Sequence, residues 1–454
     1  MNYFIISSFF FLFIQVIETL DYGDDETEQS MASVQRIDHL TSPIFARLFP
    51  SNSSSIDLHD LGITTIESDT FEGYPYPIHT MILSSNSLSQ LPSNIFKRIG
   101  QSLMHLSLQH NRFESLSENY FLRRLKQLRT LDLSYNRISE LFIQDFLGLK
   151  HLNMLILREN RINYLSYGTF TYCRTITTLD LSNNQISMID SNAFLFLKNL
   201  KALLLSNNPL GQRVLSSSLL KPLRNLQFLD LESTQLEDLP AFLFVSNQRL
   251  RSVKLRENSF HKSASLHQTF CHANSLVEID FVSANIRSLN TCSYYHIPSL
   301  RRLYLMNNPL DCSCDLFSLK YGDIYRLLLK NDHGLDTRHG NIENYLNRWI
   351  TRPELRRHLE KAYERGDFHR FPIDLSSFAR CSTPNRWAGH EIEDITGIYK
   401  QCRRHWLFME EKCRDYCQIS NYSTTTVRSP SSSTLQLNSF VFLLSISILT
   451  TSDI

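Results

Sequence analysis

The sequence predicts an α/β solenoid of about 11 coils, in which each coil adds one short strand to a curved parallel sheet. Three observations support this prediction. A phrase with alternating apolar residues recurs every 24 to 26 residues between Ser53 and Leu310. A coil of that length cannot bury its own apolar face, so successive coils must stack. Six of the nine cysteines follow the repeats, which predicts a disulfide-bonded, partly helical cap at that end.

Composition limits the possible functions. The chain has 454 residues, a formal net charge of +1 and 42% hydrophobic residues, which is typical of a globular protein. Balanced charge argues against nucleic acid as the main partner, although a local basic patch is compatible with it. No GxGxxG, GxxxxGK[ST], HExxH or GxSxG motif occurs, and no His stands beside a Ser or Cys in a recognisable nucleophile motif. We therefore expect no enzyme activity and no cofactor.

The N-terminus favours a signal peptide over residues 1–21. Phe4 to Ile17 are almost wholly apolar and precede an acidic stretch, and we place the cleavage between Thr19 and Tyr22. No Lys or Arg precedes the apolar run, and a short buried helix is the alternative. Residues 22–52 are expected to close the N-terminal end of the solenoid.

The C-terminus resembles a signal for attachment of a glycosylphosphatidylinositol (GPI) anchor. A Ser/Thr-rich spacer at 418–439 is followed by a short apolar tail at 440–454, which is the order of segments in such a signal. We expect lipid attachment at a Ser or Thr between Ser423 and Ser433, with the candidates Ser423, Ser431 and Ser432. A tail that stays disordered and a single-pass helix over 435–449 are the alternatives.

The repeat occupies residues 53–310, and its copies follow the form LxxLxLxxNxL. They start at Ile56 in a degenerate first copy and then at Ile78, Leu103, Leu128, Leu152, Ile176, Leu200, Leu226, Leu250, Leu276 and Leu300. Within a copy, as in Leu131 and Leu133, residues two apart share the core face of a short strand. An Asn at the ladder position can satisfy backbone groups of neighbouring coils. It is replaced by Leu61, Thr234 and Ala284 in three copies, where we expect a weaker ladder.

A Phe recurs five residues after the last consensus apolar position and predicts a spine along the convex side. The spine residues are Phe71, Phe96, Phe121, Phe146, Phe170, Phe194 and Phe244. The seventh copy carries Leu215, Leu219 and Leu220 instead, so we expect an irregular coil there.

This period and phrase resemble the extracellular leucine-rich repeat proteins. The disulfide-bonded N-terminal cap common in that family is absent here, because no cysteine precedes Cys173; side chains such as Ile44, Phe45, Leu48 and Phe49 are expected to close that end. Residues 311–417 resemble the family's cysteine-rich C-terminal cap. The resemblance implies disulfides between Cys312 and Cys381 and between Cys314 and Cys402. The stretch 318–379 is longer than the usual cap helix and is interpreted as a helical insertion.

Other cysteines leave alternatives open. Cys271 and Cys292 lie on consecutive coils and could form a disulfide, while Cys413 and Cys417 could pair together or exchange with Cys402. Cys173 is expected to be a buried free thiol. A zinc site including His405 could be drawn in this region, but an oxidising compartment favours disulfides, and we predict no metal site. Sequons at Asn52 and Asn421 are compatible with glycosylation.

The candidate binding surface is the concave sheet, whose side chains between the consensus leucines are expected to face solvent. Tyr, Phe, Met and Arg on such a face are typical of protein interfaces, whereas Asp in an LDL phrase is equally compatible with a purely structural role. The predicted partner-binding residues are Asp132, Tyr135, Ile156, Arg158, Asp180, Leu204, Phe228, Asp230, Lys254, Arg256, Asp280, Arg302 and Tyr304.

These features together suggest a GPI-anchored adhesion molecule or co-receptor at the outer face of the plasma membrane. Its expected partner is an extracellular or cell-surface protein, and a homophilic dimer is possible in principle. The alternative is a soluble secreted or matrix-associated recognition protein, including one that recognises microbial patterns.

Overall fold

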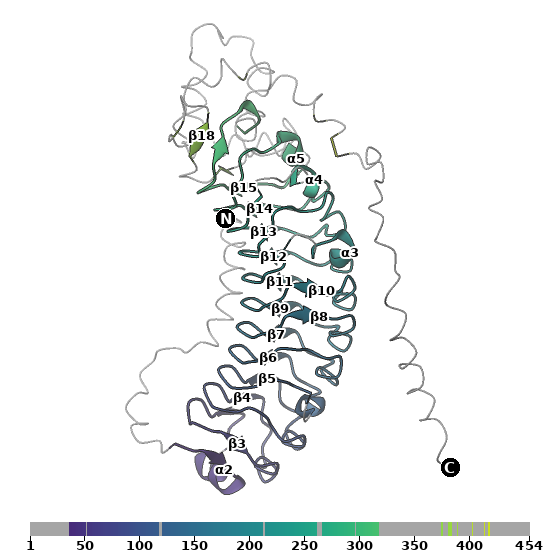
Figure 1. Ribbon diagram of the computed structural model, residues 1–454. Helices are drawn as coiled ribbons and strands as arrows, with labels where there is room; N and C mark the ends of the chain where they lie inside the picture. Colours follow the sequence, from purple (N-terminus) through teal and green to yellow (C-terminus); the bar gives the residue numbers. More distant parts are fainter. Residues whose placement is uncertain are drawn as a thin grey trace, which may run out of the picture.

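One curved stack of coils with a parallel sheet along its concave side makes up the described chain (Figure 1). The computed structural model describes residues 36–50, 52–117, 120–211, 214–260, 266–295 and 297–316, and then 374–375, 380–383, 388, 402, 413 and 416–417. The expected signal peptide, the spacer, the lipid-attachment candidates, Asn421 and the apolar tail lie outside these residues. The same is true of nearly all of the insertion at 318–379. Asn52 is described and exposed.

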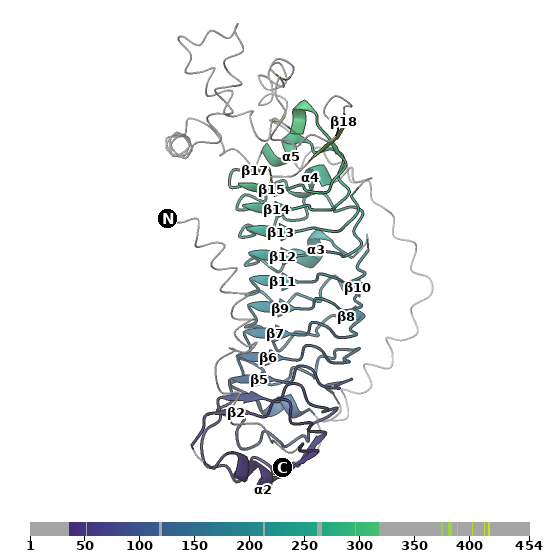
Figure 2. The same cartoon turned by 90° about the vertical axis from the view of Figure 1, so that its left-hand side faces the viewer.

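The main sheet has twelve strands, and all of them pair in parallel (Figure 2). Its order is β2 (Ser55–Asp57), β4 (Thr80–Ile82), β5 (His105–Ser107), β6 (Thr130–Asp132), β7 (Met154–Ile156), β9 (Thr178–Asp180), β11 (Ala202–Leu204), β12 (Phe228–Asp230), β13 (Ser252–Lys254), β14 (Glu278–Asp280), β15 (Arg302–Tyr304) and β17 (Asp374–Leu375). Equivalent residues of successive coils pair without a shift, so that Leu131 lies between Leu106 and Leu155.

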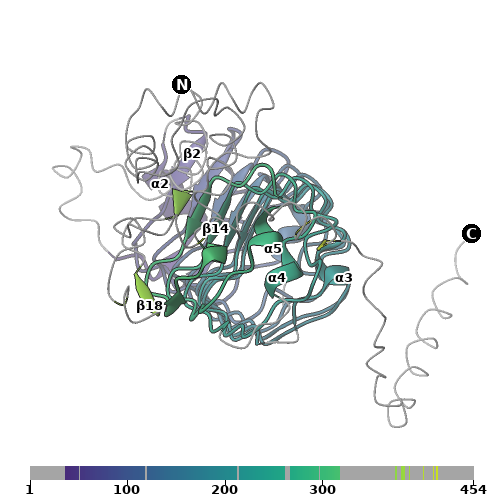
Figure 3. The same cartoon turned by 90° about the horizontal axis from the view of Figure 1, so that it is seen from above.

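The remaining short elements lie at the convex side and the two ends. Viewed along the stack, α3, α4 and α5 lie on the opposite side of the coils from the sheet (Figure 3). These elements are β1 (His39–Leu40), α2 (Ser42–Leu48), β3 (Thr65–Ile66), the 3-10 helix η1 (Phe121–Arg124), β8 (Tyr164–Leu165), β10 (Met188–Ile189), α3 (Ser217–Leu220), α4 (Leu266–Thr269), α5 (Thr291–Tyr295), β16 (Leu310–Asp311) and β18 (Cys381–Thr383).

The Asn ladder joins neighbouring coils as the sequence predicts. The side-chain amide of Asn160 donates to the carbonyl of Leu133 in the preceding coil at 2.9 Å and to Leu157 in its own coil at 3.1 Å. Its oxygen accepts from the backbone N–H of Ile138 at 3.0 Å. At Thr234 the side chain donates to the carbonyl of Leu231 in its own coil and to Asn258 in the next coil, and none of its described side-chain bonds reaches the preceding coil. The ladder therefore makes fewer hydrogen bonds between coils at Thr234, as expected.

The aromatic spine is buried and extends further than the sequence predicts. The predicted rings of Phe146, Phe170 and Phe194 stack with centroids 5.9 and 6.4 Å apart. Beyond Phe244, the spine continues through Phe270 at 5.5 Å and Tyr294 at 6.1 Å. In the seventh coil, α3 replaces the ring and buries Leu215, Leu219 and Leu220, which confirms the irregular coil.

The N-terminal cap uses apolar side chains in place of disulfides. β1 pairs with β3, and α2 begins with Pro43 in its first turn, where a proline costs no backbone hydrogen bond. Phe45 is 2% exposed and packs edge-on against Phe71 at 5.0 Å. Leu48 was expected in the cap interior but is 38% exposed, because it lies on the outer face of this two-turn helix.

Four disulfides bind the C-terminal region to the repeats. Cys312 is joined to Cys381 and Cys314 to Cys402, the pairing that the resemblance implies. β17 extends the concave sheet beyond β15, and β18 pairs with β16. The last coils are therefore covered by chain that returns from beyond residue 373.

The expected pairing of Cys271 with Cys292 is wrong. Cys271 is joined to Cys417, and Cys292 to Cys413, so both cysteines of the repeats bind the returning chain. The alternatives that paired Cys413 with Cys417, or either of them with Cys402, are wrong as well. The thiolates that a zinc site would need are thus used in disulfides.

Cys173 is free and fully buried in the fifth coil. Burial raises the pKa of its thiol to about 12, so the thiol stays protonated at neutral pH.

Candidate functional site

The concave sheet brings the predicted partner-binding residues onto one continuous surface. Ten of them lie on strands β6 to β15, and Tyr135, Arg158 and Arg256 lie in the turns that directly follow strands. In-register pairing places equivalent side chains of adjacent coils about 4.8 Å apart across the sheet. The surface is therefore built from columns of neighbouring side chains, one from each coil.

The side chains in the middle of this surface are more buried than the sequence predicts. Asp132, Asp180, Asp230 and Ile156 were expected to face solvent, yet Ile156 is 2% exposed and the three aspartates are buried. The cause is the pairing register, which places Ile156 between Asp132 and Asp180. Leu204, Phe228 and Tyr304 are half-buried and keep a face open to solvent.

The aspartates have a structural role. The carboxylate of Asp132 accepts from the backbone N–H of Ser134 at 2.9 Å and from its hydroxyl at 2.6 Å, which fixes the turn after the strand. Asp180 and Ser182 make the same two bonds. Burial raises the pKa of both carboxyls, and the serine hydrogen bonds lower it in part. These two aspartates are consequently poor candidates for direct contact with a partner.

Three side chains from consecutive coils form an exposed stack beside β5, β6 and β7, which we call the aromatic stack. The rings of His110 and Tyr135 are 4.1 Å apart and nearly parallel. The guanidinium of Arg158 lies 5.3 Å from the Tyr135 ring and donates to its hydroxyl at 2.9 Å. Tyr135 is 36% exposed and His110 is also exposed, so this stack presents a flat aromatic face with a cation to solvent.

His110 and Tyr135 occupy a backbone position that disfavours bulky side chains. The residue before the ladder position has a positive φ in every coil, 52° at His110 and 54° at Tyr135. This left-handed region is tolerated best by Gly, and among other residues Asn, Asp and His are enriched in it, so Tyr135 is the more unusual of the two. Tyr135 was predicted from its residue type alone, without its backbone strain. The signal is present in the sequence, because the sixth and seventh coils carry Asn183 and Asn207 at this position.

The C-terminal half of the concave surface carries a lattice of charged and aromatic side chains, which we call the charge lattice. Its members are Phe228, Asp230, Lys254, Arg256, Glu278, Asp280, Arg302 and Tyr304. Lys254 lies 3.4 Å from Asp230 and 5.5 Å from the ring centre of Phe228. These contacts hold the lysine over the ring in the half-buried part of the surface.

Two further ion pairs extend the charge lattice along the sheet. Arg256 Nε lies 3.5 Å from Asp280, and Arg302 Nε lies 3.3 Å from Glu278. Tyr304 borders them, and its pKa is raised by burial and by the nearby Glu278 carboxylate. The phenol is thus protonated at neutral pH and can donate a hydrogen bond.

The described residues offer little for metal chemistry or membrane insertion. They contain no group of three or more His, Cys, Asp or Glu side chains arranged to hold a metal ion. Every helix within the described ranges is too short or too polar to cross a bilayer. What the concave surface presents is a set of aromatic, cationic and ion-paired groups suited to non-covalent recognition.

Comparison with known proteins agrees with this architecture. A family model described as leucine rich repeat matches residues 76–138, 101–162 and 150–210. No curated protein matches. A solved chain from the octameric complex of Latrophilin 3, Unc5D and FLRT2, in which FLRT2 supplies the leucine-rich repeats, has a TM-score of 0.57 and 19% identity. The match covers 78% of this chain and 92% of that one.

A second match is the Toll–Spätzle complex of Drosophila, with a TM-score of 0.53 and 19% identity. It covers 80% of this chain and 50% of that chain, so the protein spans about half the length of its Toll match. At these identities the likeness shows the fold. The fold is the leucine-rich repeat solenoid, and its disulfide-bonded C-terminal region supports an extracellular protein of that class.

Proposed function

We propose that the protein binds another extracellular protein through its concave face, with the aromatic stack as the anchor. The observation that carries this proposal is the presence of His110 and Tyr135 at left-handed backbone positions while their rings stay exposed. A bulky residue there costs about 1–2 kcal/mol. Stacking on His110 and the contacts with Arg158 offset part of that cost in the free protein, and the exposed ring faces leave apolar area for a further gain on binding a partner.

The chemistry of the stack suits a protein hot spot. Tyr and Arg dominate the energetics of interfaces when they are buried on binding. In this stack Arg158 orients Tyr135 through a hydrogen bond, so less side-chain freedom is lost on association. The charge lattice would add electrostatic complementarity and select the partner's orientation. Two similar solenoids occur in complexes with other proteins, which supports a protein partner.

The test replaces Tyr135 with Asn, the residue that coils six and seven carry at this position. The wild-type chain is first screened against purified extracellular protein domains and intact cells, and its affinity for each partner found is measured. Tyr135→Asn should weaken binding on the order of 30-fold, as a hot-spot loss of about 2 kcal/mol implies. Its free energy of unfolding should stay level or rise slightly, because Asn tolerates positive φ.

Glu159→Asn is the matched control, since Glu159 occupies the same position one coil later. It should leave affinity unchanged. If Tyr135→Asn binds as tightly as wild type, the anchor lies elsewhere. A Phe228→Ala and Tyr304→Ala double variant then asks whether the charge lattice carries the affinity.

We further propose that the protein acts at the cell surface as a GPI-anchored adhesion molecule or co-receptor without enzymatic activity. The spacer and apolar tail at 418–454 support the anchor, and the four disulfides support an extracellular location. A GPI-specific phospholipase should release the protein from intact cells expressing it. Appearance of the protein in the medium without the enzyme would favour the soluble alternative.

A further inference from the structure

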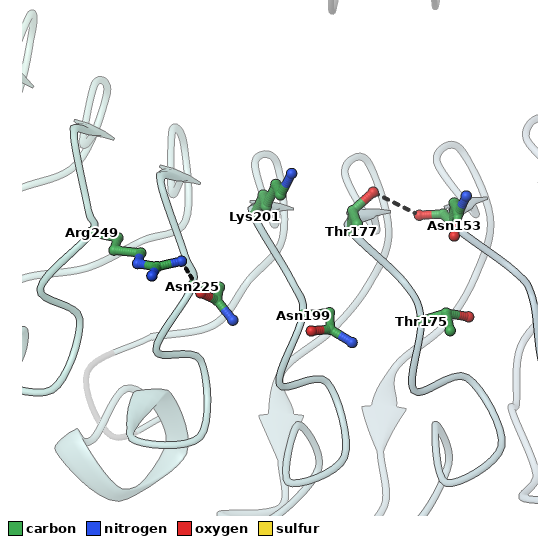
Figure 4. A pocket seen from close by; sticks show the side chains of 7 residues that line it. All are labelled: Asn153, Thr175, Thr177, Asn199, Lys201, Asn225 and Arg249. Atoms are coloured by element: carbon green, nitrogen blue, oxygen red, sulfur yellow. Dashed lines mark hydrogen bonds between the residues drawn. The ribbon is translucent and has the colours of Figure 1, made fainter.

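A polar groove of about 430 Å³ runs along one lateral edge of the solenoid, where the chain enters the strands (Figure 4). It crosses five coils, and we call it the lateral groove. Its lining is formed by Asn153, Thr175, Thr177, Asn199, Lys201, Asn225 and Arg249. Lys201, Thr177 and Asn153 lie nearest the strands, and Asn225, Asn199 and Thr175 form a second row (Figure 4). The lateral groove is therefore lined by a mixture of hydroxyl, amide and cationic groups.

A column of cations borders the lateral groove. The residue two positions before the start of the repeat phrase is basic in five consecutive coils, and we call these residues the cation column: Lys126, Lys150, Arg174, Lys198 and Arg224. All five are exposed. Successive coils in a parallel sheet are about 4.8 Å apart, so the column spans about 19 Å. It is a straight line of positive charge at a regular spacing.

Hydrogen bonds between coils hold the backbone of the cation column in place. The Thr175 hydroxyl donates to the carbonyl of Lys150 at 3.0 Å, and the Asn199 amide donates to the carbonyl of Arg174 at 3.0 Å. Asn225 donates to the carbonyl of Lys198 at 2.8 Å. The groove-lining side chains thus fix the positions from which the cations project. Backbone positions fixed in this way need no rearrangement when the side chains bind a regular polyanion, so the main ordering cost is that of the side chains themselves.

Charge is segregated across the width of the solenoid, which the net charge of +1 conceals. The segments that lead from the spine into the strands, 121–129, 146–153, 170–177, 194–201, 219–227 and 244–251, contain no Asp or Glu. The opposite edge, beyond the ladder, mixes both signs, with Arg137 lying 4.0 Å from Glu114. Among the described ion pairs, none involves a member of the cation column. Arg174 donates from Nε to the carbonyl of Thr171 at 3.3 Å and lies 5.4 Å from the Phe196 ring, so its charge is not neutralised by a described carboxylate.

We propose that the lateral groove and the cation column bind a linear sulfated polysaccharide. The sulfates would lie against the column, where Arg174 and Arg224 can form bidentate hydrogen bonds, and the sugar hydroxyls against Asn and Thr of the groove. A nucleic acid is favoured less, because the groove offers no aromatic side chain for base stacking. This site is separate from the concave surface and does not rest on the proposed protein partner.

The test measures binding of a heparin dodecasaccharide to the full-length protein by titration at several salt concentrations. A fully desulfated dodecasaccharide and a single-stranded DNA of matching charge are compared with it. The column variant is Lys150→Gln, Arg174→Gln and Lys198→Gln together. The control variant is Arg112→Gln, Arg137→Gln and Arg161→Gln, which removes the same charge from three consecutive coils at the opposite edge.

The wild type and the control variant should bind heparin, with affinity falling as salt rises, and should not bind the desulfated chain. The column variant should lose tenfold or more in affinity, roughly, with a shallower salt dependence, because three contacts are gone. Equal loss in both variants, or no binding of heparin by the wild type, would overturn the proposal. Equal binding of DNA with the same dependence on the column would also overturn it, in favour of a general polyanion site.

Discussion

At the residue scale, one backbone position decides which side chains the turn after each strand can carry. The residue before the ladder position has a φ between 52° and 58° in all eleven coils. These residues are Asp60, Ser85, His110, Tyr135, Glu159, Asn183, Asn207, Ser233, Glu257, Ser283 and Asn307. Most are small or polar, as a left-handed conformation requires. Tyr135 is the exception, and its ring stacks on His110 of the preceding coil, which is why the pair calls for a functional explanation.

The buried aspartates make stability depend on pH, and Asp132→Asn tests this. Burial raises the folded-state pKa of Asp132 above its ordinary value of 3.8. The folded state then holds this proton more tightly than the unfolded chain, so the free energy of unfolding falls as the pH rises from about 3.8 through the raised pKa. Asp132→Asn should flatten this fall, because the amide oxygen still accepts from Ser134 without carrying charge.

The measurement is urea unfolding at a series of pH values above 3.8. Asp57→Asn is the matched control, since Asp57 occupies the same strand position in the first coil with an exposed side chain. An Asp132→Asn profile as steep as that of the wild type would show that this carboxyl does not contribute to the pH dependence.

At the scale of the element, the Asn ladder is the main side-chain polar connection between coils. Asn160→Ala would remove the acceptor of the buried Ile138 N–H, while the Leu133 carbonyl would keep only its bond from Asn136. We expect a loss of about 2–3 kcal/mol in the free energy of unfolding. Thr234→Ala, at a coil where the ladder is already interrupted, should cost about 1 kcal/mol. Chemical denaturation measures the free energy of unfolding of both variants and shows which variant loses more. Equal losses would argue against the ladder's role.

Periodic features of the elements were predictable from the sequence, and features that depend on one coil were not. The ladder and spine follow from residues that recur at fixed spacing, so each copy supports the others. Phe270 was missed because it falls two residues later than the regular spacing, and Tyr294, which keeps that spacing, was missed because the pattern was followed for Phe alone. The burial of Ile156 was missed because it depends on its two neighbours in the sheet, Asp132 and Asp180.

The lateral groove was missed for a different reason. The candidate residues were all taken from the strands and the turns after them, whereas the cations lie two residues before the start of each phrase. The segments that carry these cations contain no Asp or Glu, but Asp and Glu elsewhere in the chain balance their charge. Net charge sums over both edges and cannot report their segregation.

At the scale of the whole molecule, the returning chain closes the solenoid and joins distant segments. Which cysteines pair depends on where Cys381, Cys402, Cys413 and Cys417 lie against the last coils, and repeat spacing holds no information about that placement. The pairs Cys312–Cys381 and Cys314–Cys402 were available only through a resemblance. Cys271 on the ninth coil is bonded to Cys417, and Cys292 on the tenth coil to Cys413.

Removing the disulfide between Cys271 and Cys417 should loosen one end of the molecule. In a solenoid each coil contacts only its neighbours, so a Cys271→Ser and Cys417→Ser double variant should expose the ninth to eleventh coils and leave the first eight protected. The stability loss should be about 2–5 kcal/mol. Hydrogen exchange followed by mass spectrometry resolves the two regions. Cys173→Ala is the control and should leave the last coils protected; uniform exposure along the chain would contradict the expectation.

The disulfide at Cys417 also determines how the molecule bears mechanical load. A pull on the chain beyond residue 417 reaches the ninth coil directly through the covalent link to Cys271, which lies 146 residues away in sequence. The intervening segment, with the tenth and eleventh coils and the insertion, carries none of that tension. A tether at this end would therefore hold the solenoid at its ninth coil, so that load on the aromatic stack passes through the coils between that stack and the ninth coil and bypasses the tenth and eleventh.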